Sequence, residues 1–156
     1  MNESRRTVLK ASGGATVMAL AASAGLFRSN PAMASDWNKA AFETKSLQDT
    51  VKALGGTAAV ESKDIAITSP DIAENGAVVP VSVSSKLGKT ESIAILVEKN
   101  PNALAASFDV PAGTESFVST RVKMGQTSNV YALVKADGKY FYTTKEIKVT
   151  LGGCGG

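Results

Sequence analysis

The residue best suited to chemistry in this sequence is its single cysteine. Cys154 stands third from the end, inside the pentapeptide Gly152-Gly153-Cys154-Gly155-Gly156. Glycine loses more backbone freedom on ordering than any other residue, so four glycines at a terminus predict an exposed, mobile arm. Free cysteines are usually buried as small apolar side chains, yet this one stands where its own chain cannot bury it. The pattern indicates a thiol that is presented to other molecules.

The surroundings of Cys154 predict a carrier and not a catalyst. An ordinary cysteine pKa near 8.5 leaves only a few per cent of thiolate at neutral pH. The arm holds no Lys, Arg or His, and the carboxylate of Gly156 disfavours the thiolate further. No second titratable group accompanies the thiol, so activation must come from a partner enzyme. We expect no cofactor except a substrate bound covalently to sulfur, and an extended arm of about 17 Å could thread a narrow channel.

A lone exposed cysteine also has simpler interpretations. An intermolecular disulfide is the serious alternative, and it would make the chain an exported structural or adhesive domain tethered to a partner. A Gly-rich tail can be an expression scar. Prenylation requires three residues after the cysteine, and here only two follow. Adduct masses on Cys154 would separate a carrier from a tethered domain.

The composition excludes several classes of function. The 156 residues include no His and one Cys, which removes Ser-His-Asp and Cys-His couples, His metal sites, Cys₄ and Cys₂His₂ zinc sites and cupredoxins, so no metal site is predicted. The formal charge of +3 comes from 17 basic and 14 acidic residues. Residues 1–34 hold four of the basic residues and one of the acidic ones, which leaves 13 of each. A nucleic-acid partner is therefore not expected.

The N-terminal residues have the pattern of a cleavable export signal peptide. The pair Arg5-Arg6 precedes a mostly apolar stretch over residues 11–27, and Ala32-x-Ala34 offers a peptidase site before Ser35. The paired arginines resemble a twin-arginine signal, so we expect export to the periplasm. A transmembrane anchor is the alternative, but the stretch is short and interrupted by polar residues. Cleavage between Ala34 and Ser35 would leave no membrane anchor.

The body begins with a helical pattern and continues with strands. Trp37, Ala40, Ala41, Leu47, Val51 and Leu54 recur at helical spacing, with Ser35 and Asp36 as candidate N-caps and Gly55-Gly56 as the stop. From Asp64 onward the apolar residues alternate. Strands are expected around Ile65–Thr68, Val79–Ser84 and Ile93–Val97, and over Leu104–Asp109, Glu115–Lys123, Val130–Ala136, Tyr140–Thr143 and Ile147–Leu151.

These elements predict an all-β fold. About seven short strands separated by turns favour an immunoglobulin-like β-sandwich preceded by one N-terminal amphipathic helix. Asp137-Gly138 predicts a two-residue hairpin between the last strands, because a type I′ turn needs positive φ at both positions. The expected organisation is an export signal over residues 1–34, a helix and sandwich over residues 35–151, and the carrier arm over residues 152–156.

The combination resembles the SoxY family, the sulfur-carrier subunit of the SoxYZ complex. The terminal pentapeptide around Cys154 is the most specific element of this resemblance. Three internal stretches are also similar to that family: Glu74-Asn75-Gly76 with Val79-Pro80-Val81, Lys99-Asn100-Pro101-Asn102, and Ser119-Thr120-Arg121-Val122-Lys123. The resemblance covers nearly the whole chain.

The resemblance implies a role in thiosulfate oxidation. In this family the carrier cysteine, here Cys154, receives thiosulfate from the cytochrome SoxAX as a cysteine S-thiosulfonate. SoxB then hydrolyses off sulfate, and SoxCD, where present, oxidises the remaining sulfane sulfur. The carrier pairs with SoxZ, another sandwich protein. The resemblance thus implies a heterodimer with a SoxZ-like subunit, and SoxAX-like, SoxB-like and SoxCD-like enzymes as further partners.

Overall fold

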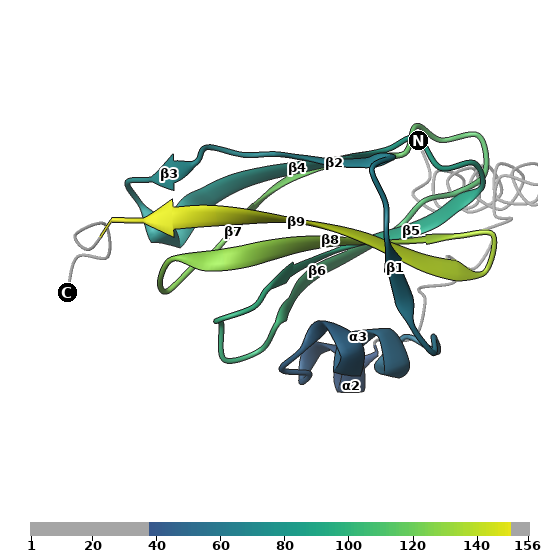
Figure 1. The fold of residues 1–156 in the computed structure, drawn as a ribbon, viewed down its shortest axis with the longest axis horizontal. Coiled ribbons are helices and arrows are strands. Elements are labelled where there is room, and N and C mark those ends of the chain that lie inside the picture. The colour runs from purple at the N-terminus through teal and green to yellow at the C-terminus, as the bar shows by residue number, and fades with distance from the viewer. Residues whose placement is uncertain (1–37, 151–156) are drawn as a thin grey trace, which may run out of the picture. The chain divides into compact units, whose positions relative to one another are not determined.

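The computed structural model describes residues 38–150, which form two packed β-sheets and two short helices (Figure 1). The expected all-β sandwich is confirmed. The predicted export signal, including Arg5, Arg6, Ala34 and Ser35, lies outside the described residues, as does the arm of Gly152, Gly153, Cys154, Gly155 and Gly156. Within residues 38–150, no helix has both the length and the apolar character needed to cross a membrane.

The helical region differs from the prediction, because two short helices replace the single one. These are α2 (Lys39–Phe42) and α3 (Leu47–Ala53). The hydroxyl of Thr44 donates to the carbonyl of Ala41 at 2.7 Å, and the backbone of Ser46 is extended. The Ser46 hydroxyl accepts from the amide of Asp49 and starts a new helix. The observed N-caps are therefore Asn38 and Ser46, while Ser35 and Asp36 lie outside the described residues.

The helix stop was predicted correctly at Gly55-Gly56. Gly55 follows the end of α3 with φ at +87°. Its amide donates to the carbonyl of Lys52 at 3.0 Å, and the amide of Gly56 donates to the carbonyl of Val51 at 2.8 Å. These two bonds form a Schellman motif, which pairs the last carbonyls of the helix.

The larger sheet has the strand order β1-β9-β8-β5-β6, and β3 pairs with the far end of β9. The smaller sheet has the order β2-β4-β7. The two strands expected over residues 140–143 and 147–151 are replaced by the single long strand β9, which ends at Val149, and Leu151 lies outside the described residues. The bounds are β1 (Ala59–Glu61), β2 (Ile65–Thr68), β3 (Ile72–Ala73), β4 (Val79–Ser85), β5 (Thr90–Val97), β6 (Leu104–Asp109), β7 (Phe117–Val122), β8 (Ser128–Ala136) and β9 (Lys139–Val149), with a 3₁₀ turn, η1, at Gly76–Val78.

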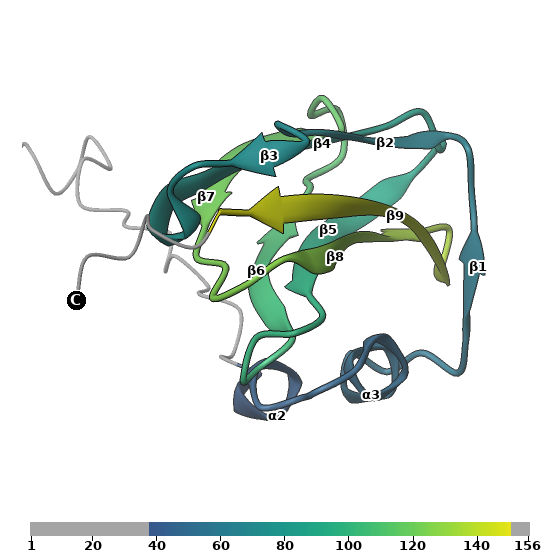
Figure 2. The same cartoon turned by 60° about the vertical axis from the view of Figure 1, so that its left-hand side comes forward.

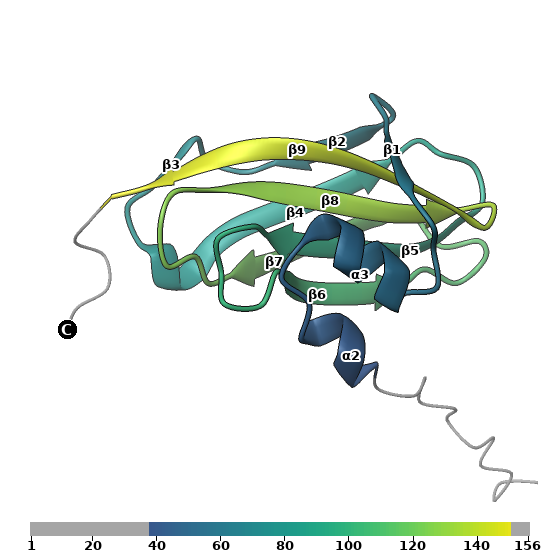
Figure 3. The same cartoon turned by 60° about the horizontal axis from the view of Figure 1, so that its bottom comes forward.

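The larger sheet is covered on both faces. One face packs against the smaller sheet, and the other packs against α2 and α3 (Figures 2 and 3). Ile93 and Ile95 of β5 contact the first layer, while Ala94 and Leu96 contact the second. All five residues from Ile93 to Val97 are buried, which explains their continuous apolar run.

The turn between β8 and β9 confirms the hairpin prediction. Asp137 and Gly138 have φ of 49° and 73°, so both central residues of the turn have the positive φ that a type I′ turn requires. The antiparallel register runs without a shift from Ala136↔Lys139 to Ser128↔Ile147. The hairpin fixes the direction in which β9 runs.

One side of the sandwich is closed by the chain itself. The chain passes from β1 in the larger sheet to β2 in the smaller sheet and back to β3. The ammonium of Lys145 in β9 donates to the carbonyl of Ser69 at 2.6 Å and pairs with Asp71 at 2.9 Å, which ties down the connection between β2 and β3. The hydrogen bond and charge of Lys145 lower the pKa of Asp71. On the opposite side, β6 and β7 each have a strand neighbour on one edge alone.

Gly76 provides a test of this packing. Its carbonyl accepts from the amide of Met124 at 2.7 Å, and a Cβ at Gly76 would overlap the carbonyl oxygen of Met124. We expect Gly76→Ala to lower the free energy of unfolding by about 1–3 kcal/mol in urea titrations, because backbone must move. Gly88→Ala is the control, since a Cβ there meets nothing within 4 Å. Equal stability of the two variants would show that the contact is not tight.

Candidate functional site

The part of the predicted carrier site that the structure describes is the segment before residues 152–156, which we call the root of the arm. Strand β9 ends at Val149, and Thr150 is the last described residue before the arm. The predicted site residue Cys154 lies outside the described residues. The described residues show the support that precedes the predicted arm.

The root is fixed by four hydrogen bonds. The amide of Lys148 donates to the carbonyl of Asp71 at 2.9 Å, and the amide of Thr150 donates to that of Ala73 at 3.1 Å, as the parallel pairing of β3 with β9 requires. The amide of Val149 donates to the hydroxyl oxygen of Thr127 at 3.0 Å. The hydroxyl of Thr150 donates to the carbonyl of Glu74 at 3.4 Å. The chain is therefore held on both edges up to Thr150.

The three internal stretches that carry the family resemblance meet at this end of the sandwich. They are joined by backbone–backbone hydrogen bonds and by a hydrogen bond from a polar side chain to the backbone. The amide of Met124, next to Lys123, donates to Gly76, and the side chain of Asn100 donates to the carbonyl of Lys123 at 2.8 Å. Strands β4 and β7 bring Val79 opposite Val122. The sequence placed these stretches in separate turns and strands and gave no sign that they meet.

A groove of about 500 Å³ lies beside this junction. Arg121 and Lys123 are its charged lining residues, and neither has a salt bridge within residues 38–150. The other lining residues are small, polar or aliphatic: Asn100, Pro101, Asn102, Leu104, Ala105, Ala106, Thr120 and Val122. The groove is thus a weakly basic surface without a nucleophile.

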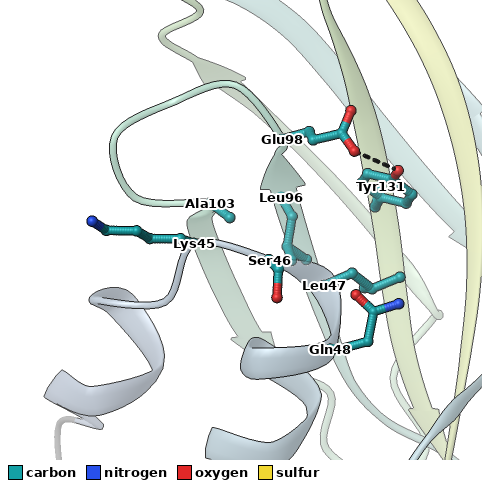
Figure 4. Close-up of a pocket in the computed structure, with 8 residues that line it drawn as sticks. All are labelled: Lys45, Ser46, Leu47, Gln48, Leu96, Glu98, Ala103 and Tyr131. Atoms are coloured by element: carbon teal, nitrogen blue, oxygen red, sulfur yellow. Dashed lines mark hydrogen bonds between the residues drawn. The ribbon is translucent and has the colours of Figure 1, made fainter.

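A second cavity, of about 240 Å³, lies between α3 and the larger sheet (Figure 4). The carboxylate of Glu98 accepts from the hydroxyl of Tyr131 at 3.2 Å and from the side chain of Asn129 at 3.0 Å. Burial, followed by the charge of Glu98, raises the pKa of Tyr131. The tyrosine therefore stays protonated as a hydrogen-bond donor, and the arrangement holds one satisfied carboxylate with no nucleophile beside it.

The described residues supply no metal ligand cluster. No group of three or more His, Cys, Asp or Glu side chains within residues 38–150 is placed to hold an ion. Sequence reasoning missed both the groove and the Glu98–Tyr131 contact. The acid and the tyrosine are 33 positions apart, and only the pairing of β5 with β8, which places Val97 opposite Val130, brings them together.

A match to a protein-family model identifies the class of protein to which this chain belongs. The model of a family described as sulfur oxidation protein SoxY matches residues 51–154. That match covers most of the sandwich and extends to Cys154. The chain belongs to the SoxY family, as the sequence resemblance predicted.

A solved structure agrees with this assignment. The sulfur carrier protein SoxY from Chlorobium limicola f thiosulfatophilum is 39% identical, with a TM-score of 0.62, and the match covers 67% of this chain and 96% of that one. A superoxide reductase (neelaredoxin) from Ignicoccus hospitalis is 20% identical, with a TM-score of 0.49 and coverage of 55% and 80%. This second match is too weak to support an argument. The comparison with curated proteins gives no match.

The hydroxyl of Thr127 offers a direct test of the arm root. Thr127→Val removes the acceptor for the amide of Val149, and we expect faster amide hydrogen exchange at Val149 and Thr150 and a loss of about 1–3 kcal/mol in stability. Thr127→Ser keeps the acceptor and should exchange like the wild type. If Thr127→Val leaves the exchange of both amides unchanged, the root is held by the pairing of β3 with β9 alone.

Proposed function

We propose that this chain is a periplasmic covalent carrier of sulfur intermediates, which it holds on Cys154 and presents to partner enzymes. The observation that carries the proposal is the SoxY family match, which runs through residue 154. The anchoring of β9 up to Thr150 supports it, because an arm can present a thiol reproducibly only if its root is fixed. The chain itself would not be the catalyst.

The chemistry proposed on Cys154 has two steps, followed by a third where a SoxCD-like enzyme is present. A SoxAX-like cytochrome joins thiosulfate to the thiol, forming a sulfur–sulfur bond, releasing one proton and accepting two electrons. Water then attacks the terminal sulfone sulfur in a SoxB-like hydrolase, which releases sulfate and leaves the sulfane sulfur on Cys154. A SoxCD-like dehydrogenase, where present, oxidises that sulfur. In each step the catalytic groups belong to the partner.

The proposed partner of the body is a SoxZ-like sandwich subunit. The SoxY family match supports this partner. Export through the twin-arginine pathway, directed by Arg5 and Arg6 and completed by cleavage between Ala34 and Ser35, would place the carrier in the periplasm. The nearly balanced charge of residues 35–156 supports protein partners over nucleic acid.

The carrier role is tested on Cys154. Cys154→Ser should abolish sulfate production from thiosulfate in the reconstituted system, with an unchanged unfolding curve, because the thiol is the attachment point. Intact mass of the protein from cells that oxidise thiosulfate should show sulfur or sulfur-oxyanion adducts and a mature N-terminus at Ser35. Full sulfate production by the Cys154→Ser variant would refute the carrier role. A stable disulfide to another chain would favour the tethered structural domain.

The glycines are tested with Cys154 in place. Gly153→Val with Gly155→Val adds two β-branched side chains beside the thiol and restricts the backbone. We expect iodoacetamide to modify the free thiol at nearly the wild-type rate, while enzymatic loading falls on the order of 10²-fold, since small misplacements in a channel are costly. Unchanged enzymatic turnover would mean that the glycines do not serve channel access.

A further inference from the structure

The free strand edges of this sandwich are not equally protected. Exposed edges are usually blunted by short strands, bulges, lysines or prolines. The edge strands β1, β2 and β3 have three, four and two residues, and β6 carries an irregularity where Ala105 is skipped in its pairing with β5. Strand β7 has six residues, pairs with β4 without any register shift, and contains no lysine or proline. Among the described strands, β7 thus offers the longest regular free edge.

The register shows which backbone groups of β7 face outward. The amide of Ser85 donates to the carbonyl of Ser116, and hydrogen-bonded pairs alternate along an antiparallel ladder. The two residues in each of the pairs Ser82↔Ser119 and Pro80↔Arg121 are therefore not joined by backbone hydrogen bonds. The amides and carbonyls of Ser119 and Arg121 point to the free edge of β7. Pro80 has no amide hydrogen, which agrees with this assignment.

The exposed residues along this edge form a self-complementary pattern about Ser119. They are Glu115, Phe117, Ser119, Arg121 and Lys123, and each is exposed. A second β7, antiparallel and centred on Ser119, brings Glu115 and Lys123, which flank the strand, to the same end of the pair and places Phe117 opposite Arg121. The first pair joins opposite charges, and the second sets a guanidinium against an aromatic ring. Phe117 is 49% exposed and is the one aromatic residue among the four exposed large apolar side chains of the described residues.

We propose that two copies of this chain associate through β7, which extends the smaller sheet across a two-fold axis at Ser119. Ser119 exchanges two backbone hydrogen bonds with its symmetry mate. The amide of Arg121 donates to the carbonyl of Phe117 in the second copy, twice per dimer. The amide of Phe117 already donates to the carbonyl of Glu115 at 2.8 Å, so the backbone pairing ends there. The surface is isologous, because each residue meets its complement in the partner copy.

The rest of the molecule permits this contact. The edge of the larger sheet beneath β7 carries Ala105, Ala106 and Ser107, whose side chains are small. Neither Arg121 nor Lys123 has a salt bridge within residues 38–150, so the cross-strand pairs displace no existing one. The proposal goes beyond the carrier role and does not require it, since no step involves Cys154.

A charge exchange tests the pairing directly. The chain is purified in its exported form under reducing conditions, which removes disulfide dimers, and its dimer Kd is measured by sedimentation equilibrium. Lys123→Glu and Glu115→Lys should each raise the Kd roughly tenfold or more, because each substitution sets like charges together at two symmetric positions. The double variant Glu115→Lys with Lys123→Glu should restore the wild-type Kd.

A backbone variant tests the strand pairing itself. Ser119→Pro removes an amide that faces the free edge and spares the ladder with β4, so it should give a monomer with a wild-type circular dichroism spectrum. Ser119→Ala is the matched control, because it removes only the hydroxyl, which bonds Ser82 at 2.8 Å, and should still dimerise. Lys139→Glu repeats the charge change of Lys123→Glu at an exposed position of β9, in the larger sheet, and should also dimerise.

Three results would overturn the proposal. The first is a reduced wild-type protein that stays monomeric at every concentration measured. The second is a dimer whose Kd responds to neither Lys123→Glu nor Ser119→Pro. The third is a double charge variant that fails to recover while it retains a wild-type unfolding curve. None of these results depends on thiosulfate oxidation, so they can be distinguished from a failure of the carrier role.

Discussion

The hydrogen bonding of β9 along both of its edges is the constraint on which the rest of the structure depends. Strand β8 pairs with one edge from Lys139 to Ile147, while β1 and β3 pair with the two ends of the other edge. In chain order β2 comes between β1 and β3, but it belongs to the smaller sheet. The chain therefore crosses from the larger sheet to the smaller one and back, and closes one side of the sandwich. The pairing on both edges also makes β9 rigid up to Thr150. The same pairing therefore closes the fold and fixes the origin of the arm.

The sequence predicted the elements that short-range patterns determine. Alternating apolar residues located most strands, Gly55-Gly56 located the end of α3, and Asp137-Gly138 located the hairpin, because φ and hydrogen bonding at these positions are set by neighbouring residues. The helix break at Thr44–Ser46 was missed. Ser and Thr side chains can bond the backbone either inside a helix or at its end, so their presence in the sequence does not show where a helix stops.

Features that depend on strand order could not be predicted. The alternation of Val79, Val81 and Val83 shows that one face of β4 is buried but gives no information about its neighbours. The support of Val149 by Thr127 and the contact of Gly76 with Met124 join residues 22 and 48 positions apart. Cys154, in contrast, was conspicuous in the sequence because its glycine neighbours have no other physical purpose in a packed domain.

If the chain is the proposed carrier, its fixed root limits where a partner can take up cargo. Four residue steps separate Thr150 from Cys154, so an extended chain reaches about 14 Å at most. In the proposed role, the thiol would therefore reach only a region around the end of the sandwich where β9, the loop at Asn100 and the turn after Lys123 meet. An enzyme that acts on the proposed cargo would have to bring its active-site entrance to that end. Pairing through β7 would leave the two arms of a dimer related by the two-fold axis, so each could be served by its own enzyme.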